Sequence, residues 1–325
     1  MRAVVITRPG PPEVLEIRDV PAPTPSAGEV RVRVAAFGIN RADLLQRRGL
    51  YPPPAGAPKD IPGLEYAGEV DALGSGVEGV AVGDRVMGIV AGGAYAELVV
   101  TPAAHVLPIP KRLAFEQAAA IPEAFLTAHD ALEQGGVAKG EWVLIHAVGS
   151  GVGTAAVQLT RERGARTIGT SRTKAKLERA LLLGVDAGID VTAEPIAAAV
   201  RRITGGGGAD AALDLVGGPE FTATLESLAL RGRVVLIGLT AGARADVDLG
   251  LVLRRRLRIV GTVLRSRSDE EKAALVKAFR RKVLSLLGSG RVQPVIDRVE
   301  PVERIREAHS YVESNANFGK VIVHL

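Results

Sequence analysis

A glycine-rich turn between an apolar strand and a helix constrains the fold of this chain more than any other feature. A strand is predicted over Trp142–Val148, because its first four residues are all apolar, as in a strand covered by helices on both faces. The turn Gly149-Ser150-Gly151-Val152-Gly153 follows, and a helix is predicted over Thr154–Arg163. Such a turn lets backbone N–H groups at a helix N-terminus approach a phosphate.

The glycine spacing departs from the strict G-x-G-x-x-G pattern. If Gly153 is the third glycine, Val148 and Ser150 occupy the first two positions. A purely structural turn is therefore an alternative. In the phosphate-binding interpretation Gly149, Gly151 and Gly153 relax the turn, and the Ser150 hydroxyl adds a hydrogen bond.

Strand-like and helical segments alternate from about residue 122 onward. Further strands are predicted over Thr167–Thr170, Ala187–Asp190, Ala211–Val216, Arg233–Gly238 and Leu257–Val263, and further helices over Lys174–Leu183, Pro195–Thr204 and Glu220–Leu230. This alternation predicts a parallel, doubly wound sheet in an α/β fold.

The two ends of the chain show a different pattern, in which short strands do not alternate regularly with helices. Short strands are predicted over Glu29–Ala35, Tyr66–Val70, Asp84–Ile89, Ala94–Val100, Pro294–Val299 and Lys320–Leu325. A helix is predicted from a capping box of Ser268 with Glu271 to Gly288, and another around Val302–Glu313. Short strands at this spacing indicate a β-barrel-like domain built from both ends. We therefore expect residues 1–122 and 268–325 in one domain and residues 123–267 in the other.

The amino-acid composition excludes several classes of functional site and partner. The chain has no cysteine, which excludes disulfides, thiolate nucleophiles and cysteine-ligated zinc. The net charge of +5 is compatible with a nucleic-acid partner and equally with an enzyme that binds phosphorylated or anionic ligands. The basic cluster Arg254-Arg255-Arg256 is expected in a solvated turn before a strand, and no aromatic residues accompany it for nucleic-acid stacking. No apolar run reaches the roughly 18 residues of a membrane span, so we expect a cytoplasmic protein with neither nucleic-acid nor membrane partner.

The end of the second strand predicts the cofactor. NAD enzymes place an acid here for the ribose 2′-hydroxyl, but residues 169–176 contain no carboxylate. Ser171, Arg172 and Lys176 instead complement a 2′-phosphate, because charge-assisted bonds to phosphate are strong. We predict NADPH; the alternative is an exposed helix start with scattered cations.

Several motifs together resemble the zinc-free quinone oxidoreductase branch of the medium-chain dehydrogenase/reductase superfamily, closest to its p53-inducible subgroup. They are Asn40-Arg41-Ala42-Asp43, Arg47-Arg48-Gly49-Leu50-Tyr51-Pro52-Pro53-Pro54, Pro62-Gly63-Leu64-Glu65-Tyr66-Ala67-Gly68, Ala118-Ala119-Ala120-Ile121-Pro122, Ser150-Gly151-Val152-Gly153, Leu264-Arg265-Ser266-Arg267 and Asn317-Phe318-Gly319-Lys320. The resemblance implies a GroES-like, β-rich catalytic domain and a Rossmann NADPH-binding domain. Asn40 and Leu64 stand where zinc-dependent relatives have their metal ligands, so no catalytic metal is expected.

The resemblance also implies functional residues. It places Asn40 and Tyr51 on the nicotinamide side as catalytic or positioning residues. Cofactor contacts are implied at Thr127, Ser150, Gly151, Val152, Gly153, Gly238, Leu239, Leu264 and Asn317. Asp190-Val191 departs from the family's usual tyrosine on the adenine side.

The function expected is NADPH-dependent quinone reduction by hydride transfer. Tyr51 is the best candidate for a substrate contact, although packing against the following prolines is an alternative. Glu65 is expected to form a buried ion pair with an arginine, Asp214 to anchor the turn after its strand, and the histidines to be structural or solvated. The alternatives are an NADPH-dependent reductase of enals, enones or enoyl thioesters, which needs a positioned proton donor, and an NADPH-binding protein with little turnover. The predicted edge strand Leu257–Val263 favours a homodimer, or a larger homotetramer.

Overall fold

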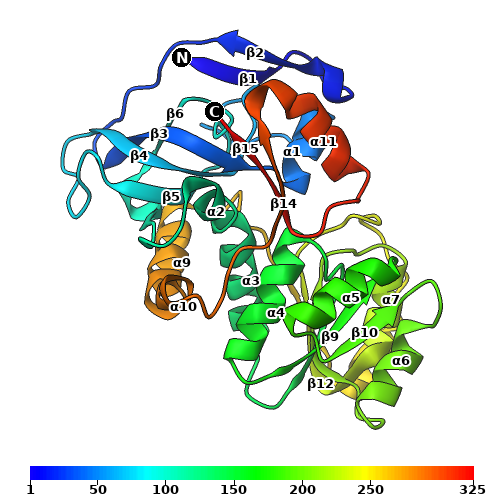
Figure 1. Ribbon diagram of the computed structural model, residues 1–325. Coiled ribbons are helices and arrows are strands. Elements are labelled where there is room, and N and C mark those ends of the chain that lie inside the picture. Colours follow the sequence, from blue (N-terminus) through cyan, green and yellow to red (C-terminus); the bar gives the residue numbers. More distant parts are fainter. The chain divides into compact units, whose positions relative to one another are not determined.

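The computed structural model describes all 325 residues, and they form two compact units (Figure 1). Unit 1 comprises Met1–Leu126 and Leu264–Leu325, and unit 2 comprises Thr127–Val263. Unit 1 therefore contains both chain ends. The domain limits expected at residues 122/123 and 267/268 stay a prediction.

Unit 1 is built on a seven-stranded sheet. Its strands are β3 (Glu29–Gly38), β4 (Glu65–Leu73), β5 (Arg85–Ile89), β6 (Leu98–Pro102), β7 (Val106–Pro108), β14 (Ile296–Pro301) and β15 (Lys320–His324). The order is β14-β15-β3-β4-β5-β7, with β6 also pairing with β3. Since β15 pairs antiparallel with β3, the end of the chain completes a sheet that its beginning starts.

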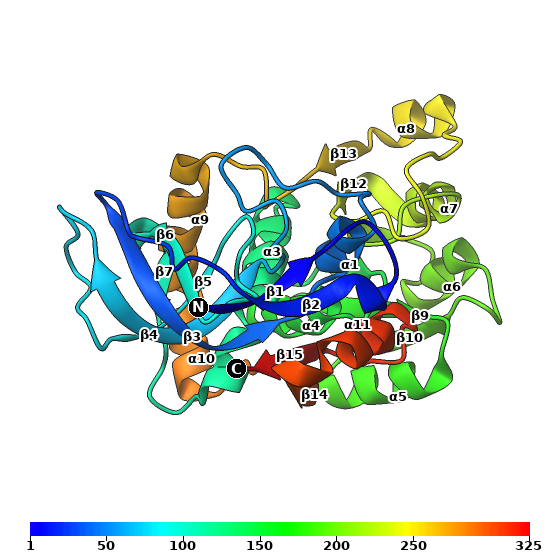
Figure 2. The same ribbon diagram turned by 90° about the horizontal axis from the view of Figure 1, so that it is seen from above.

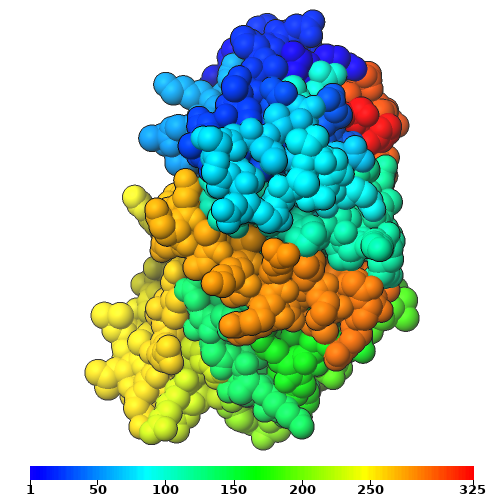
Figure 3. Space-filling view, turned by 90° about the vertical axis from the view of Figure 1, so that its left-hand side faces the viewer, coloured from blue at the N-terminus to red at the C-terminus, as the bar shows by residue number.

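Smaller elements surround this sheet. They are β1 (Arg2–Ile6) and β2 (Leu15–Asp19), which form a two-stranded sheet, the helices α1 (Arg41–Arg47), α2 (Phe115–Ala119), α9 (Asp269–Lys282), α10 (Leu284–Ser289) and α11 (Ile305–Glu313), and the short 3₁₀ turns η1 (Pro12–Val14), η2 (Ala103–His105) and η3 (Val302–Arg304). Helix α11 lies beside β14 and β15, as Figure 2 shows. Figure 3 shows α9 and α10, in orange, at the surface of unit 1, where α9 packs on η2 and β7.

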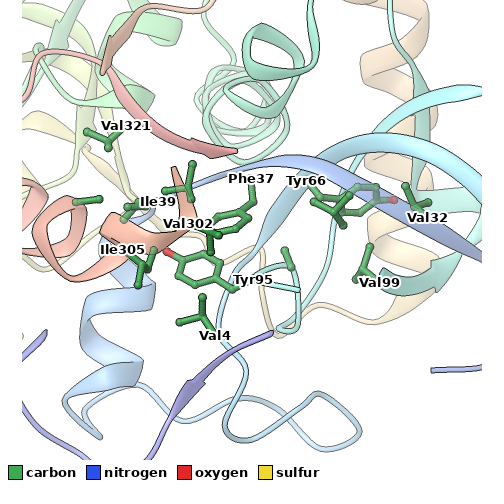
Figure 4. Packing of buried hydrophobic residues seen from close by; sticks show 14 of the residues in the cluster. Val4, Val32, Phe37, Ile39, Tyr66, Tyr95, Val99, Val302, Ile305 and Val321 are labelled. Carbon is green, nitrogen blue, oxygen red and sulfur yellow. The ribbon is translucent and has the colours of Figure 1, made fainter. Parts of the chain in front are cut away.

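Strand alternation produces the core of unit 1. Val30, Val32 and Val34 of β3 are buried, while Arg31 and Arg33 point away and both pair with one aspartate of β4. The core includes aromatic rings: Phe37 stacks on Tyr95 with ring centroids 4.2 Å apart (Figure 4). The half-buried strand predicted over Glu29–Ala35 is confirmed, and it continues to Gly38.

Unit 2 is a six-stranded, fully parallel sheet with the order β10-β9-β8-β11-β12-β13. The strands are β8 (Trp142–Ile145), β9 (Arg166–Ser171), β10 (Ala187–Asp190), β11 (Ala209–Asp214), β12 (Leu228–Leu236) and β13 (Arg258–Gly261). Helices α4 (Gly151–Glu162), α5 (Lys174–Leu183), α6 (Ile196–Ile203), α7 (Glu220–Ser227) and α8 (Leu249–Arg255) pack on it, and α3 (Pro122–Gln134) crosses the boundary of the units. The order 3-2-1-4-5-6 is that of a dinucleotide-binding fold, so the predicted doubly wound sheet is confirmed.

Some local predictions were wrong. The helix predicted over Glu220–Leu230 ends at Ser227, because β12 begins at Leu228 and pairs with β11 and β13. The long helix ending at Gly288 is two helices that meet at Val283 and end at Gly290.

Two further local predictions were also wrong. The strand predicted from Ala94 begins only at Leu98. The arginine cluster precedes a strand as expected, but only Arg256 lies in the turn, with a left-handed backbone of φ 51°, because Arg254 and Arg255 form the end of α8. None of the helices combines the length and hydrophobicity that crossing a membrane requires.

Candidate active site

The glycine turn of unit 2 links β8 to α4. Ser150 is the N-cap of α4, and its Oγ accepts a hydrogen bond of 3.0 Å from the Gly153 N–H. A Cβ on Gly153 would lie 2.6 Å from the Ala147 carbonyl oxygen, so only glycine lets the helix approach the strand this closely. Gly151 and Val152 form the first turn, where backbone N–H groups have no helical partner. This geometry fits a pyrophosphate.

A second turn lies across the point where the strand order reverses. Strands β8 and β11 are neighbours, and the chain leaves them in opposite directions along the sheet, which is where doubly wound folds bind ligands. Asp214 ends β11, and its Oδ1 accepts hydrogen bonds of 2.8 Å from the N–H groups of Val216 and Gly217. The predicted role of Asp214 as the anchor of this turn is confirmed.

A buried hydrogen-bond network supports both turns. His146 follows β8; its Nδ1 lies 3.1 Å from the Thr170 hydroxyl and its Nε2 lies 2.9 Å from the Thr224 hydroxyl. The Thr224 hydroxyl also lies 3.3 Å from Asp214. Burial lowers the pKa of His146, so it stays neutral and structural, as expected for it.

The residues predicted to bind a 2′-phosphate lie at the end of β9 and the start of α5. The Ser171 Oγ accepts a hydrogen bond of 3.1 Å from the Thr173 N–H, and Arg172 is exposed without an ion pair. Lys176 is partly buried on the first turn of α5. Asp190 of β10 is the register neighbour of Ser171, but its carboxylate already accepts two hydrogen bonds from Thr192.

The remaining cofactor candidates occupy different places. In unit 2, Gly238 and Leu239 follow β12, where the Gly238 N–H donates to the Asp214 carbonyl oxygen, and Thr127 is partly exposed on α3. In unit 1, Leu264 is buried, and the Asn317 side chain donates to the Gly319 carbonyl oxygen within the turn before β15. Their contacts with a cofactor stay predictions.

In unit 1, Asn40 and Asp43 define the start of α1. The Asn40 N–H donates to Asp43 Oδ2 at 2.8 Å, which fixes the loop before α1. Asp43 also accepts from the Gly63 N–H at 3.2 Å and from the Tyr95 hydroxyl at 3.0 Å. Gly63 has φ +105°, which explains the glycine of the Pro62-Gly63 motif. Burial raises the pKa of Asp43 to about 6, against the opposing effect of these hydrogen bonds.

A second buried carboxylate, Glu65, forms an ion pair that joins distant parts of the chain. Its Oε1 lies 2.6 Å from Lys320 Nζ and accepts from Asn40 Nδ2 at 2.9 Å. Lys320 also donates to the Asn40 Oδ1 at 2.6 Å and to the Ile39 carbonyl oxygen at 3.0 Å. The prediction that Glu65 pairs with an arginine was wrong, because Lys320 of the last strand is its partner. The amide group of Asn40 is thus held entirely by protein groups.

Arg265 positions the segment that carries Tyr51. Its guanidinium donates to the carbonyl oxygens of Ala91 at 2.8 Å and Tyr51 at 3.2 Å, and to the Gln46 side chain at 2.5 Å. It also lies 5.0 Å from the centre of the Tyr51 ring. Burial raises the pKa of Tyr51, so its hydroxyl stays protonated. That hydroxyl has no hydrogen-bond partner in the protein and is partly accessible.

Glu123 is the one charged residue of this cluster that the sequence did not single out. It lies in the first turn of α3, and its backbone N–H donates to Glu65 Oε2 at 2.8 Å. Its carboxyl group is partly accessible and makes no hydrogen bond or ion pair. Burial, followed by the Glu65 carboxylate, raises its pKa to about 8. An acid in the first turn of a helix is common, so the sequence offered no signal of function here.

The structure thus brings together two sets of predicted residues, one in each unit. Asn40 and Tyr51 lie in a polar cluster with Glu65, Glu123 and Arg265 in unit 1. In unit 2, the residues from Ser150 to Gly153 follow β8, and Ser171 ends the adjacent parallel strand β9. No three histidine, aspartate or glutamate side chains are grouped as metal ligands.

Comparisons with known proteins agree with this arrangement. Residues 26–111 match the family described as alcohol dehydrogenase GroES-like domain, and residues 151–280 match that described as zinc-binding dehydrogenase. The quinone oxidoreductase of Pseudomonas aeruginosa is 33% identical over 317 residues, which cover 97% of this chain and 96% of the relative.

Solved structures are similar over the full length. The Escherichia coli quinone oxidoreductase complexed with NADPH superposes with a TM-score of 0.90 at 30% identity, covering 100% of both chains. An NAD-dependent alcohol dehydrogenase superposes with a TM-score of 0.87 at 35% identity, again covering 100% of both chains. Relatives with this fold therefore differ in cofactor and substrate.

Proposed function

Because this chain belongs to the medium-chain dehydrogenase/reductase superfamily and has quinone oxidoreductases among its relatives, we propose that it reduces quinones with NADPH, without a catalytic zinc ion. The oxidoreductase class comes with the family. The quinone substrate, the cofactor and the independence from zinc are the finer parts of the proposal.

The observation that carries the cofactor assignment is the pair of phosphate sites on adjacent strands. The turn from Ser150 to Gly153 presents free N–H groups, and Arg172 follows the neighbouring strand with no carboxylate to neutralise it. A 2′-phosphate attracts such a cation, whereas a 2′-hydroxyl prefers an acid. NADPH, when bound, supplies the hydride.

The chemistry of the side chains supports reduction without zinc. The two positions that correspond to metal ligands in zinc-dependent relatives hold Asn40 and Leu64. Leu64 has no donor atom, and the Asn40 amide is occupied by Glu65, Lys320 and a backbone carbonyl. Zinc sites in proteins use thiolate, imidazole and carboxylate ligands, and this set offers none that is free.

The residues of unit 1 would act on a quinone by orientation. Hydride transfer to a quinone yields weakly basic oxygens, which take protons readily from water. The Tyr51 hydroxyl is protonated and free to donate to a substrate oxygen, while Arg265 fixes the backbone that carries it. Alignment of this kind is the protein's main contribution to hydride transfer.

The test is NADPH consumption at neutral pH against a matched panel of ortho-quinones, para-quinones and linear enones, repeated with NADH. We expect turnover of quinones with NADPH and much weaker turnover with NADH. Tight NADPH binding with no consumption for any acceptor would overturn the proposal in favour of a cofactor-binding protein. Inhibition by zinc chelators at unchanged protein stability would overturn the zinc-independent part.

We also propose that the protein is a homodimer. The edge strand β13 and helix α8 expose several apolar side chains, including Leu249, Leu253 and Ile259. An apolar edge strand of this kind is suited to pairing with a second copy.

A further inference from the structure

We propose that Glu123 is the proton donor of the active site and that it equips the protein to reduce carbonyl-conjugated alkenes as well as quinones. This inference rests on the proposed NADPH-dependent reduction. It identifies Glu123 as the acid that enone reduction requires. Quinone reduction does not require such an acid.

Most of the polar groups that surround Glu123 are already occupied by hydrogen bonds within the protein. Lys320 uses its three N–H bonds on Glu65, Ile39 and Asn40, so it has none to offer a substrate. Glu65 is fully buried and accepts from Asn40, Lys320 and the Glu123 N–H. Neither group can move a proton without breaking this network.

The buried acid Asp43 and the groups hydrogen-bonded to it are occupied within the protein in the same way. Asp43 is fully buried and held by Asn40, Gly63 and Tyr95. The Tyr95 hydroxyl connects it to His309 Nε2 at 3.1 Å. These groups lie in the interior, without access to a bound molecule.

Two accessible side chains with free polar atoms remain, Tyr51 and Glu123. The pKa of Tyr51 is raised above its ordinary value, which makes it a hydrogen-bond donor but a poor acid at neutral pH. Arg265, which lies over its ring, does not release protons. The Glu123 carboxyl group is held by nothing, is partly accessible, and lies close enough to Tyr51 and Arg265 to interact electrostatically with both.

The position of Glu123 also keeps it protonated. Its backbone N–H is fixed on Glu65, so a second negative charge would form beside the first. With a pKa of about 8, it holds its proton at neutral pH and can still release it. A catalytic acid works best when its pKa lies near the working pH.

Reduction of an enone consumes one hydride and one proton. NADPH, when bound, would supply the hydride from its nicotinamide C–H bond to the β-carbon of the enone, and the C=C electrons would shift to the carbonyl oxygen. The Glu123 O–H bond breaks and its proton goes to that oxygen, which gives an enol and the Glu123 carboxylate. The enol becomes the saturated ketone in water, and Glu123 takes a proton back from solvent. In total, NADPH, a proton and the enone yield NADP⁺ and the saturated ketone.

The first measurement compares wild type with Glu123→Gln, which keeps the shape of the side chain but removes the acid. For an enone, we expect kcat/KM of wild type to fall as pH rises through about 8. In the variant it should be about 100-fold lower at neutral pH and lose this dependence. Quinone turnover should fall far less. The matched control is Glu116→Gln, another first-turn acid in unit 1, which should change neither profile.

The second measurement does not depend on turnover. Infrared difference spectra recorded between about pH 6 and about pH 10 should show a protonated carboxyl band that disappears with a midpoint near 8 and is absent from Glu123→Gln. If enones are reduced but both measurements match between wild type and variant, the assignment of Glu123 is wrong. If the band titrates as expected and no acceptor is reduced, the proposed function fails instead. Unchanged thermal unfolding of the variant excludes misfolding.

Discussion

At the scale of single residues, the Arg172 side chain has no partner in the protein. It follows β9, and the neighbouring strand β8 leads into the glycine turn that we propose binds the cofactor. The free guanidinium of Arg172 predicts a cofactor preference. Replacing Arg172 by alanine should raise the Kd for NADPH about 10-fold or more and leave that for NADH unchanged, because a charge-assisted hydrogen bond contributes ~1.5–3 kcal/mol. Fluorescence titration with both cofactors measures this. The control is Arg166→Ala, at the opposite end of β9. Equal loss of both cofactors would contradict the role of Arg172.

His309 predicts how stability changes with pH. Burial, with the positive Arg47, lowers its pKa from 6.5 to about 3. An unfolded chain takes up this proton as pH falls below 6.5 while the folded chain does not, so His309 stabilises the fold at neutral pH and this contribution is lost on acidification. Between pH 7 and pH 5 the loss is about 2 kcal/mol. Asp43, with its pKa raised to about 6, acts in the opposite direction, because the folded state gains its proton first.

The measurement is urea unfolding at both pH values. In His309→Gln the free energy of unfolding should be lower at pH 7, since its bonds with Arg47 and Tyr95 are weakened. It should then fall by ~2 kcal/mol less than in wild type on going to pH 5. His324→Gln, at an exposed position, serves as control. An identical pH dependence in wild type and His309→Gln would show that this histidine does not carry the effect.

At the scale of elements, Arg265 ties the segment after α1 to the chain that follows β13. Arg265→Met should leave the carbonyl oxygens of Tyr51 and Ala91 and the Gln46 side chain without their donor, at a cost of ~2–4 kcal/mol. We expect a lower thermal midpoint, and faster thermolysin cleavage near Tyr51 if the segment loosens before global unfolding. Lys111→Met, at an exposed site in unit 1, is the control. Cleavage as slow as in wild type would mean that Arg265 does not fix this segment.

Individual elements also show which structural features could be predicted from the sequence and which could not. Apolar periodicity, glycine turns and caps are local, and they predicted the parallel sheet, the Ser268–Glu271 capping box and the Asp214 turn. Pairing across the whole chain is not local. Nothing near Glu65 indicates that Lys320 is its partner, and nothing near Glu123 indicates that packing raises its pKa. Leu228 to Leu230 look helical in isolation, but Leu228 pairs with Ala209 of β11, and this sheet pairing outweighs the helical preference.

For the whole molecule, the exposed apolar face of α8 and β13 predicts association. Leu253 is 77% exposed and Ile259 is 47% exposed, and β13 has an unpaired edge. Burying these side chains against a second copy stabilises a dimer by roughly 25 cal/mol per Å² of apolar surface. Sedimentation at micromolar concentration should give twice the chain mass of 33.9 kDa.

A double variant and a control variant distinguish self-association through this face from nonspecific association. Leu253→Asp combined with Ile259→Lys should give a monomer with an unchanged circular dichroism spectrum, because both side chains lie at the surface and contribute little to either core. Leu182→Asp, which replaces a leucine 90% exposed on α5, should remain dimeric. A monomeric wild type, or a dimer that survives the double substitution, would place self-association away from this edge. In that case the unpaired β13 would depend on its one arginine, Arg258, and on Arg256 just before the strand to repel other edge strands.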